Sequence, residues 1–279
     1  MNDQELLQAA ICAAISGSSE ILDIYGQEFE VEFKVDKSPL TLADQYAHEA
    51  ICNALKATGL PILSEEGKNI PYEIRKDWER FWLVDPLDGT KEFVKRNGEF
   101  TVNIALISNR KAVMGVILVP VSGLLYFASR STGAFKIILE GKGDMSLEKM
   151  MQDAESLPLP GLLHTVTVVG SRSHLSQETT DFVQNLQKNQ PDLDFISIGS
   201  SLKLCLIAEG KAHIYPRLGP TMEWDTAAGQ AIVEISGGKM VQADSGEAVL
   251  YNKPDLHNPW FVASRLFFCF DQFHIKNER

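Results

Sequence analysis

The chain has 279 residues, of which 44% are hydrophobic and 23% charged, and its formal net charge is −11. This composition is typical of a globular protein, and the length allows one large or two medium domains. The acidic balance argues against broad binding of nucleic acid or anionic membranes, because both need a basic surface.

The first half of the chain predicts two helices and an antiparallel meander. Residues 3–24 place apolar side chains at helical spacing before Gly26, and residues 41–57 resume that spacing. Between them, residues 29–35 alternate apolar and polar side chains, as in a half-buried strand. Turn residues separate the later apolar runs. The strands predicted from these runs are 81–84, 100–108, 112–119 and 124–128.

The second half alternates strands with helices. Residues 140–161 are rich in glycine, charge and proline, which indicates a surface excursion and a domain boundary. We therefore predict an α+β domain over 1–157 and an α/β domain over 158–279, packed on each other. The predicted strands are 165–169, 195–198 and 213–215, and the predicted helices are 176–189, 201–209 and 225–234.

Two aspartates stand where the strand at 81–84 ends. Asp85 and Asp88 are separated by Pro86 and Leu87, and Pro86 restricts the backbone of the turn. Two carboxylates this close repel each other unless a cation lies between them. The acidic pair 65–66 follows another apolar stretch upstream. The pattern predicts an oxygen-ligand site for a hard cation, with Mg²⁺ as the occupant.

A third acidic element precedes the helix predicted at 225–234. Asp225 by itself is best explained as a helix cap, because aspartate is common at that position. Together with Glu65, Asp85 and Asp88 it acquires a second interpretation, since all four stand where an apolar segment ends or a helix begins. Distant parts of the chain would then supply the ligands of one metal cluster.

These motifs in combination resemble the inositol monophosphatase superfamily. The resemblance rests on the string 85–90 with the acidic pair 65–66 before it, and on 224–229 with Gly237 and Gly238 after it. The longer string 85–107 is more similar to the bacterial 3'(2'),5'-bisphosphate nucleotidases of that superfamily. The resemblance implies a layered αβαβα fold of the sugar-phosphatase type, with an antiparallel sheet in the first half and a mixed α/β layer in the second. It also implies a lithium-sensitive phosphatase that depends on two or three Mg²⁺ ions.

The resemblance assigns the metal ligands residue by residue. Glu65, Asp85 and the backbone carbonyl of Leu87 would hold one Mg²⁺, whereas Asp85, Asp88 and Asp225 would hold a second. A third ion would share Glu65 with water. Two metals about 3.5 to 4 Å apart suit an in-line displacement at phosphorus, because they stabilise both the attacking and the leaving oxygen.

The resemblance also implies a pair that activates the attacking water. Thr90 supplies a hydroxyl, and its carboxylate partner is Asp44 by analogy with nucleotidases or Glu65 by analogy with inositol phosphatases. We take Asp44 and Thr90 as the pair and keep Glu65 as the alternative. Without the resemblance, Asp44 would be explained as a helix-capping or solvated residue and Thr90 as the cap of its turn.

Substrate choice is predicted to lie in the second half. By resemblance, Ser200, Lys203 and Arg217 would hold the phosphate that is not cleaved, and His174 would contact the nucleoside. The remaining substrate contacts implied are residues of the metal motif, namely Glu65, Leu87, Asp88, Gly89, Thr90 and Asp225. An arginine with a serine at a helix start suits a phosphate. Taken alone, Lys203 would more often be a solvated side chain of its helix, and His174 a surface histidine.

The function expected from the resemblance is hydrolysis of the 3'-phosphate of adenosine 3',5'-bisphosphate to AMP and phosphate. It implies a role in sulfur assimilation and extends to 3'-phosphoadenylyl sulfate. The alternatives are an inositol or fructose-bisphosphatase-like sugar phosphatase, and a regulatory protein that binds a partner without catalysis. The intact acidic set argues against the last.

Partner and compartment follow from weaker signals. The four cysteines stand far apart without a Cys-x-x-Cys pair, which favours reduced thiols in the cytoplasm. The N-terminal segment lacks the positive start of a secretion signal, and no apolar run is expected to span a membrane. The predicted partner is the small nucleotide, without nucleic acid. Monomer or homodimer, and peripheral attachment to the inner membrane, stay open.

Overall fold

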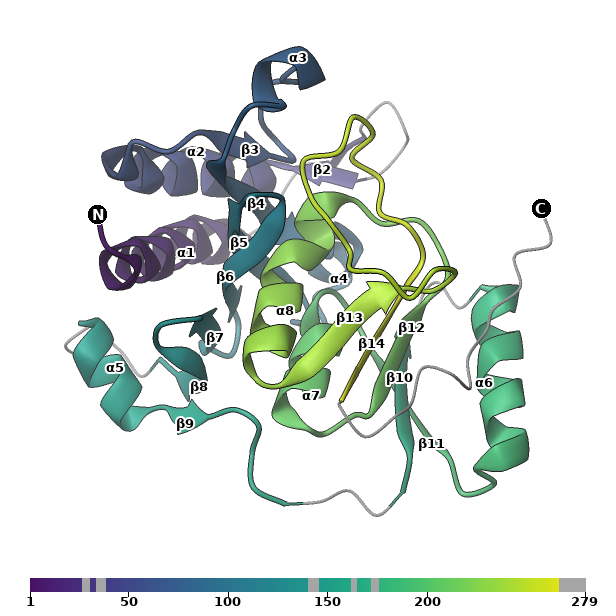
Figure 1. The fold of residues 1–279 in the computed structure, drawn as a ribbon. Coiled ribbons are helices and arrows are strands. Elements are labelled where there is room, and N and C mark those ends of the chain that lie inside the picture. The colour runs from purple at the N-terminus through teal and green to yellow at the C-terminus, as the bar shows by residue number, and fades with distance from the viewer. Residues whose placement is uncertain (27–30, 34–38, 140–145, 162–164, 172–175, 266–279) are drawn as a thin grey trace.

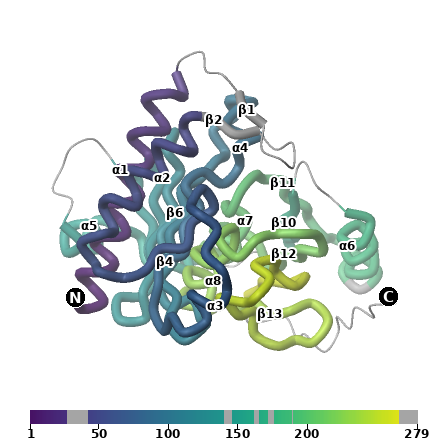
Figure 2. The backbone as a smooth tube through the Cα atoms, turned by 90° about the horizontal axis from the view of Figure 1, so that it is seen from above, coloured from purple at the N-terminus to yellow at the C-terminus, as the bar shows by residue number. Residues whose placement is uncertain are grey.

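The computed structural model describes residues 1–26, 31–33, 39–139, 146–161, 165–171 and 176–265. Its elements stack as five layers in the order αβαβα (Figure 1). Helices α1 (Asp3–Tyr25) and α2 (Leu42–Leu55) cover the outer face of a seven-stranded sheet, and α6 (Gln177–Asn189) covers the outer face of a five-stranded sheet. Figure 2 shows these outer helices at opposite sides of the molecule.

Helices α7 (Leu202–Glu209) and α8 (Glu223–Ile235) form the layer between the two sheets. They are hydrophobic on both sides, and most of the residues of α8 are buried. Such a helix is stable only where another layer covers each side. The start of α8 is thereby held at the junction of the two sheets, and Asp225 stands in its first turn.

The seven-stranded sheet has the order β3-β4-β5-β6-β7-β8-β9. All neighbouring strands pair antiparallel except β3 and β4, which are parallel. The strands are β3 (Ile62–Ser64), β4 (Arg80–Asp88), β5 (Thr101–Ser108), β6 (Lys111–Val119), β7 (Leu124–Ser129), β8 (Gly133–Ile138) and β9 (Glu155–Ser156).

The five-stranded sheet is mixed, in the order β11-β10-β12-β14-β13. Strand β10 pairs parallel with β11 and with the central strand β12, whereas β14 pairs antiparallel with β12 and with β13. The strands are β10 (Thr167–Ser171), β11 (Asp194–Ile198), β12 (Ile214–Arg217), β13 (Gly238–Gln242) and β14 (Phe261–Arg265). The remaining described elements are β1 (Val31–Phe33), β2 (Pro39–Thr41), the 3₁₀ helix η1 (Lys56–Thr58), α3 (Tyr72–Arg75), α4 (Thr90–Val94) and α5 (Leu147–Asp153).

The expected layered fold is confirmed. The predicted helices in both halves of the chain are confirmed as well, and so is the antiparallel meander. Most of the differences lie in segments whose partners are distant in the sequence. Residues 140–161 were expected to form a surface excursion, and 140–145 of them lie outside the described residues. In the rest, α5 buries Leu147 and Met150 in the core beneath α1, and β9 adds a strand to the sheet. Strands β3, β13 and β14 were also missed, because short strands are defined by partners that lie elsewhere in the sequence. Strand β8 was missed too, although it pairs with the adjacent β7.

Among the described residues, one helix is long and apolar enough to cross a membrane, and it is α1. It passes this test by length and composition only, and 44% of the apolar window is buried inside the structure. The inner face of α1 packs on α2 and on β6, where Leu7, Ile11 and Ile21 are fully buried. A capping box between Asn2 and Glu5 closes its N-terminal end.

The chain passes from the first sheet to the second between β9 and β10. The larger core cluster nevertheless combines side chains of β4–β7 with those of α7, α8 and the second sheet. The division into domains 1–157 and 158–279 therefore stays a prediction.

Gly115 of β6 allows α8 to approach the sheet closely. A Cβ atom there would lie 2.2 Å from the backbone oxygen of Ala228, and a backbone atom cannot move aside as a side chain can. We expect Gly115→Ala to lower the free energy of unfolding by about 3 kcal/mol, since overpacking a rigid contact strains both layers. Urea unfolding would measure this. Gly26→Ala is the matched control, because nothing lies within 4 Å of its Cβ position; equal stability of both variants would contradict the close contact.

Candidate metal and phosphate site

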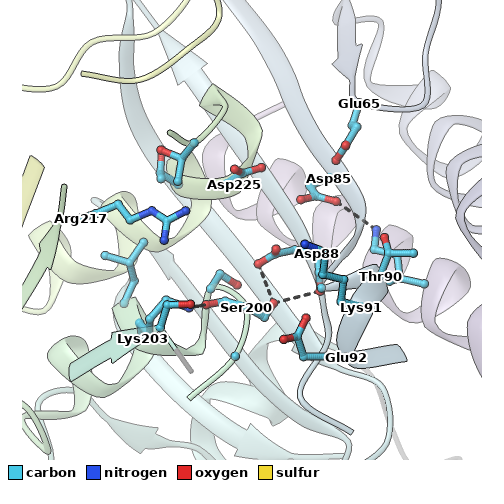
Figure 3. A pocket seen from close by; sticks show the side chains of 18 of the residues that line it. Glu65, Asp85, Asp88, Thr90, Lys91, Glu92, Ser200, Lys203, Arg217 and Asp225 are labelled. Atoms are coloured by element: carbon cyan, nitrogen blue, oxygen red, sulfur yellow. Dashed lines mark hydrogen bonds between the residues drawn. The ribbon is translucent and has the colours of Figure 1, made fainter. Parts of the chain in front are cut away.

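A pocket of about 320 Å³ opens where the two sheets meet, and acidic side chains line one side of it while basic side chains line the other (Figure 3). Six segments contribute: the end of β3, the end of β4 with α4, the end of β10, the β11–α7 loop with α7, the end of β12, and the start of α8 with the residues before it. The charged and hydroxyl side chains of the lining are Glu65, Asp85, Asp88, Thr90, Lys91, Glu92, Ser171, Ser200, Ser201, Lys203, Tyr215, Arg217, Thr221, Asp225 and Thr226.

Three carboxylates converge at the acidic side. One oxygen each of Glu65, Asp85 and Asp225 lies within 4.8 Å of the others. Glu65 reaches this point because β3 runs parallel to β4, and its N–H donates to the carbonyl of Val84 at 3.1 Å. The C-terminal ends of neighbouring parallel strands lie at the same edge of a sheet, so Glu65 and Asp85 are side by side.

The turn that carries Asp85 and Asp88 is an irregularity at the end of β4. The pairing of β4 with β5 shifts between these two residues, which allows both to face the pocket. The N–H of Leu87 donates to Oδ1 of Asp85 at 3.1 Å and orients that carboxylate. Gly89 follows with a φ of 94°, and α4 begins at Thr90. A residue with a side chain would be strained at Gly89, so the motif needs glycine there.

Asp225 has both of the roles considered from the sequence. Its Oδ2 accepts a hydrogen bond from the N–H of Met222 at 2.9 Å, which caps α8, and the same carboxylate faces the pocket. The buried carboxylate of Glu223 anchors this helix end, because it accepts from the N–H groups of Asn252 at 2.6 Å and Lys253 at 3.0 Å. Arg75 in turn donates to the side chain of Asn252 at 2.8 Å. The first turn of α8 is therefore held rigidly.

The carboxylates on the acidic side of the pocket repel one another, and burial adds to the cost of their charge. Burial raises the pKa of Asp85 well above its ordinary value, and neighbouring carboxylates raise it further. Burial, and then the charge of Asp88, raises the pKa of Asp225 to about 8. The carboxylates that act on Asp85 are Glu65, Asp88, Asp225 and Asp44. Such a cluster fits a divalent cation with oxygen ligands, whose charge would keep all of these groups ionised.

Lys203 and Arg217 form the basic side. The Lys203 side chain is buried, so the interpretation of this residue as a solvated helix side chain is wrong. Its ammonium lies 5.7 Å from the ring centre of Tyr215 and donates to the carbonyls of Ser200 and of Ile198. Burial is the main cause that lowers its pKa to about 8, and the charge of Arg217 contributes. Arg217 donates through Nη2 to the carbonyl of Pro220 at 2.8 Å, and its buried Nε has no partner among the described residues.

The structure brings most of the predicted site residues into this one pocket. Asp44 is an exception: it is buried in the first turn of α2, outside the lining, although its charge acts on Asp85. His174 lies outside the described residues. The predicted residues found in the lining are Glu65, Asp85, Leu87, Asp88, Gly89, Thr90, Ser200, Lys203, Arg217 and Asp225. The roles assigned to them stay predictions.

Several polar residues at the pocket were missed. Glu92 and Thr221 line it, while Glu99, Thr101 and Asn103 lie behind the β11–α7 loop and contact it through hydrogen bonds. No local motif marks these residues, because their partners are about 100 positions away in the chain. Only the alternation of Thr101 and Asn103 on one face of a predicted strand could have suggested that they act together.

The fold and the pocket define the class: a layered α/β protein with a carboxylate cluster suited to metal ions. The model of the inositol monophosphatase family matches residues 2–266, and the chain belongs to this family. It is 41% identical over 261 residues to the 3'(2'),5'-bisphosphate nucleotidase CysQ of Salmonella typhimurium, covering 92% of this chain and 98% of that protein. It is 42% identical over 228 residues to CysQ of Escherichia coli strain K12, covering 80% of this chain and 85% of that protein.

A solved crystal structure of a CysQ protein is also similar to this chain, in both sequence and fold. The crystal structure of CysQ from Bacteroides thetaiotaomicron, described as a bacterial member of the inositol monophosphatase family, superposes with a TM-score of 0.87 at 50% identity. The match covers 94% of this chain and 98% of that one.

Proposed function

We propose that the protein is a Mg²⁺-dependent phosphatase that hydrolyses the 3'-phosphate of adenosine 3',5'-bisphosphate to AMP and phosphate. The observation that carries this proposal is one pocket with carboxylates on one side and two cations, the buried Lys203 and the half-buried Arg217, on the other. Such a pocket suits a substrate with two phosphates, because metal ions held by the carboxylates would bind one phosphate and the side chains of Lys203 and Arg217 would bind the other. The relatives named as 3'(2'),5'-bisphosphate nucleotidases support the choice.

The acidic side would hold two or three Mg²⁺ ions. Their ligands would be the carboxylates of Glu65, Asp85, Asp88 and Asp225 and the carbonyl of Leu87, which are the oxygen donors that Mg²⁺ prefers. When bound, the ions supply positive charge for the phosphoryl oxygens and lower the pKa of a water molecule.

The protein's own groups would then carry the proton and orient the reactants. The oxygen of the attacking water forms the new bond to phosphorus as the bond to the ribose 3'-oxygen breaks. The water gives up one proton to the protein, the ribose 3'-oxygen takes up one proton from solvent to leave as a hydroxyl group, and the protein returns its proton to solvent, so that the step balances. We assign Thr90 to orient the attacking water and Asp44 to receive its proton, with Glu65 as the alternative acceptor. The buried position of Asp44, whose charge acts on the cluster, is compatible with this role but does not distinguish it from Glu65.

Lys203 and Arg217 would hold the 5'-phosphate. Arg217 has a guanidinium that pairs well with phosphate oxygens. Burial lowers the pKa of Lys203, and a bound phosphate would favour its charged ammonium form. His174 stays a predicted contact of the nucleoside. Action on 3'-phosphoadenylyl sulfate belongs to the proposal as well, since its 5'-end is also anionic.

The substrate assignment can be tested with Arg217→Gln. We expect the KM for adenosine 3',5'-bisphosphate to rise about tenfold or more, because one charged hydrogen-bond partner is worth about 1.5 to 3 kcal/mol. Hydrolysis of 3'-AMP, which has no 5'-phosphate, should change little. Phosphate release measured on both nucleotides, and on inositol 1-phosphate, would provide these values.

Arg130→Gln is the control, because Arg130 is exposed in the β7–β8 turn. If the normal protein preferred inositol 1-phosphate to the nucleotide, the sugar-phosphatase alternative would replace this proposal. If Arg217→Gln raised the KM equally for both nucleotides, Arg217 would not bind the second phosphate.

The cytoplasm is the compartment that we propose. Cys12, Cys52 and Cys205 are free thiols in the structure, as expected for a reducing environment. Peripheral attachment to a membrane and the choice between monomer and homodimer stay untested predictions.

A further inference from the structure

Glu92 supplies a carboxylate to the pocket that the proposed reaction does not use. It stands in the first turn of α4, directly after the acidic turn 85–90, and it lines the pocket. Its carboxylate makes no hydrogen bond and no ion pair with any described residue. In Figure 3 this carboxylate points toward the space between Ser200 and Lys91. The pocket therefore contains an anionic acceptor that the protein itself leaves free for a ligand.

Two glycines show that this side chain lies at the boundary between the acidic and the basic side. A Cβ atom at Gly89, in the acidic turn, would lie 3.2 Å from Oε2 of Glu92. A Cβ atom at Gly199, in the β11–α7 loop, would lie 2.9 Å from Cγ of Glu92. The side chain is thus packed between the turn that would hold metal and the loop that leads to Lys203. Its charge acts on Lys203, where it opposes the lowering of the pKa that burial causes.

Two simpler roles of Glu92 fit the structure less well. A glutamate in the first turn of a helix often accepts from the N–H of the N-cap residue, but no side chain makes that bond to Gly89 at the start of α4. A metal ligand would belong to the group of carboxylates that converge within 4.8 Å of one another. Among the described residues, that group does not include Glu92.

A free carboxylate determines which part of a substrate can lie beside it. It repels phosphate oxygens and accepts hydrogen bonds from hydroxyl groups. By the proposed function, the cleaved phosphate would lie at the acidic side and the other phosphate on Lys203 and Arg217. The ribose that joins the two phosphates would then cross the boundary where Glu92 lies. Its one free hydroxyl is on carbon 2', next to the carbon that carries the cleaved phosphate.

We propose that Glu92 is a specificity-determining residue that accepts a hydrogen bond from the ribose 2'-hydroxyl, so that the pocket distinguishes a ribonucleotide from its 2'-deoxy analogue. The inference rests on the proposed function. The contact lies beside the reacting phosphate and holds the ribose where the 3'-oxygen leaves. A hydrogen bond to a charged acceptor corresponds to a preference of about tenfold or more for the ribonucleotide.

The test compares adenosine 3',5'-bisphosphate with its 2'-deoxy analogue by phosphate release at saturating Mg²⁺. We expect kcat/KM of the normal protein to be about tenfold or more higher for the ribonucleotide, and Glu92→Ala to reduce this ratio to about twofold or less. Glu92→Gln keeps the size of the side chain but not its charge, so it should lower the ratio by a smaller factor.

The ratio isolates the contact from two other effects. The 2'-hydroxyl also changes the leaving group, but it does so equally in every variant. Loss of charge at Glu92 also acts on Lys203, but equally for both nucleotides. Glu148→Ala is the matched control, because Glu148 is an exposed acidic residue in the first turn of another short helix, α5, and lies outside this pocket. Its ratio should equal that of the normal protein.

An unchanged ratio in Glu92→Ala, or a normal protein that hydrolyses both nucleotides equally well, would overturn the inference while the proposed function stands. A higher Kd for Mg²⁺ in Glu92→Ala, measured by calorimetry without substrate and accompanied by an unchanged ratio, would overturn it and assign Glu92 to the metal. If the normal protein hydrolysed neither nucleotide, the proposed function would be overturned together with the inference.

Discussion

Asp88→Asn is expected to lower kcat/KM at least about a hundredfold, the scale seen when a group that stabilises the transition state, or a metal held by it, is lost. Asp88 lies at the middle of the pocket, and its charge raises the pKa of both Asp85 and Asp225. Asparagine has nearly the same shape but no charge, so the backbone around it is retained. Steady-state phosphate release at saturating Mg²⁺ would measure the loss.

Asp153→Asn is the control for this change, because Asp153 is an exposed residue paired with Lys149 on α5. Near-normal kinetics of Asp88→Asn would count against the whole assignment of the site. If the variant lost Mg²⁺ binding but kept the cellular function of the protein, the alternative of a regulatory binding protein would be favoured instead.

Removal of metal is expected to destabilise the protein more at high pH than at low pH. The folded pKa of Asp225 is about 8, above the ordinary value of 3.8, and that of Asp85 is raised as well. A carboxyl group with a raised pKa favours the folded state at low pH, and this contribution is lost as pH rises through the folded pKa. The metal-free protein should therefore lose stability between about pH 4 and pH 8.

Bound Mg²⁺ should cancel that loss. Because Asp225 is half-buried and faces pocket water, we expect about 3 kcal/mol, roughly half of what the full pKa difference would give. Urea unfolding in chelator and in saturating Mg²⁺, at about pH 5 and about pH 9, would measure the difference. Asp225→Asn should flatten the metal-free profile. If the metal-free protein were equally stable at both pH values, the pKa values of these carboxylates would not be raised in the folded protein.

The parts of the fold that could be predicted are those whose signal is local. The helix α1 has its apolar stripe, its cap and its terminal glycine within 26 consecutive residues, and the meander β5–β7 has turns between adjacent strands. The string 85–90 is also local, since its proline, glycine and paired carboxylates act on one another. For this reason the sequence was sufficient to predict these elements and the acidic turn, whereas the layered fold was expected from the family resemblance that the motifs carry.

The segments that were missed depend on distant partners. Helix α5 looks like a polar surface segment until α1 covers Leu147 and Met150. Strand β14 becomes a strand between β12 and β13, and β13 pairs with β14. Lys203 shows the same limit at the site. Its place on a helix suggests solvent, but α7 lies between two sheets, so the side chain is buried and its pKa is lowered.

By itself the sequence determined the acidic motif, the family that the motif resembles and the order of most elements, because these depend on residues close together in the chain. The tertiary structure alone decided which charges share one pocket and that the carboxylate of Glu92 lines it without a partner among the described residues. That position depends on the β11–α7 loop, because Gly199 packs against the side chain of Glu92 although the two residues lie far apart in the chain. Residue type and spacing carry no information about such a contact.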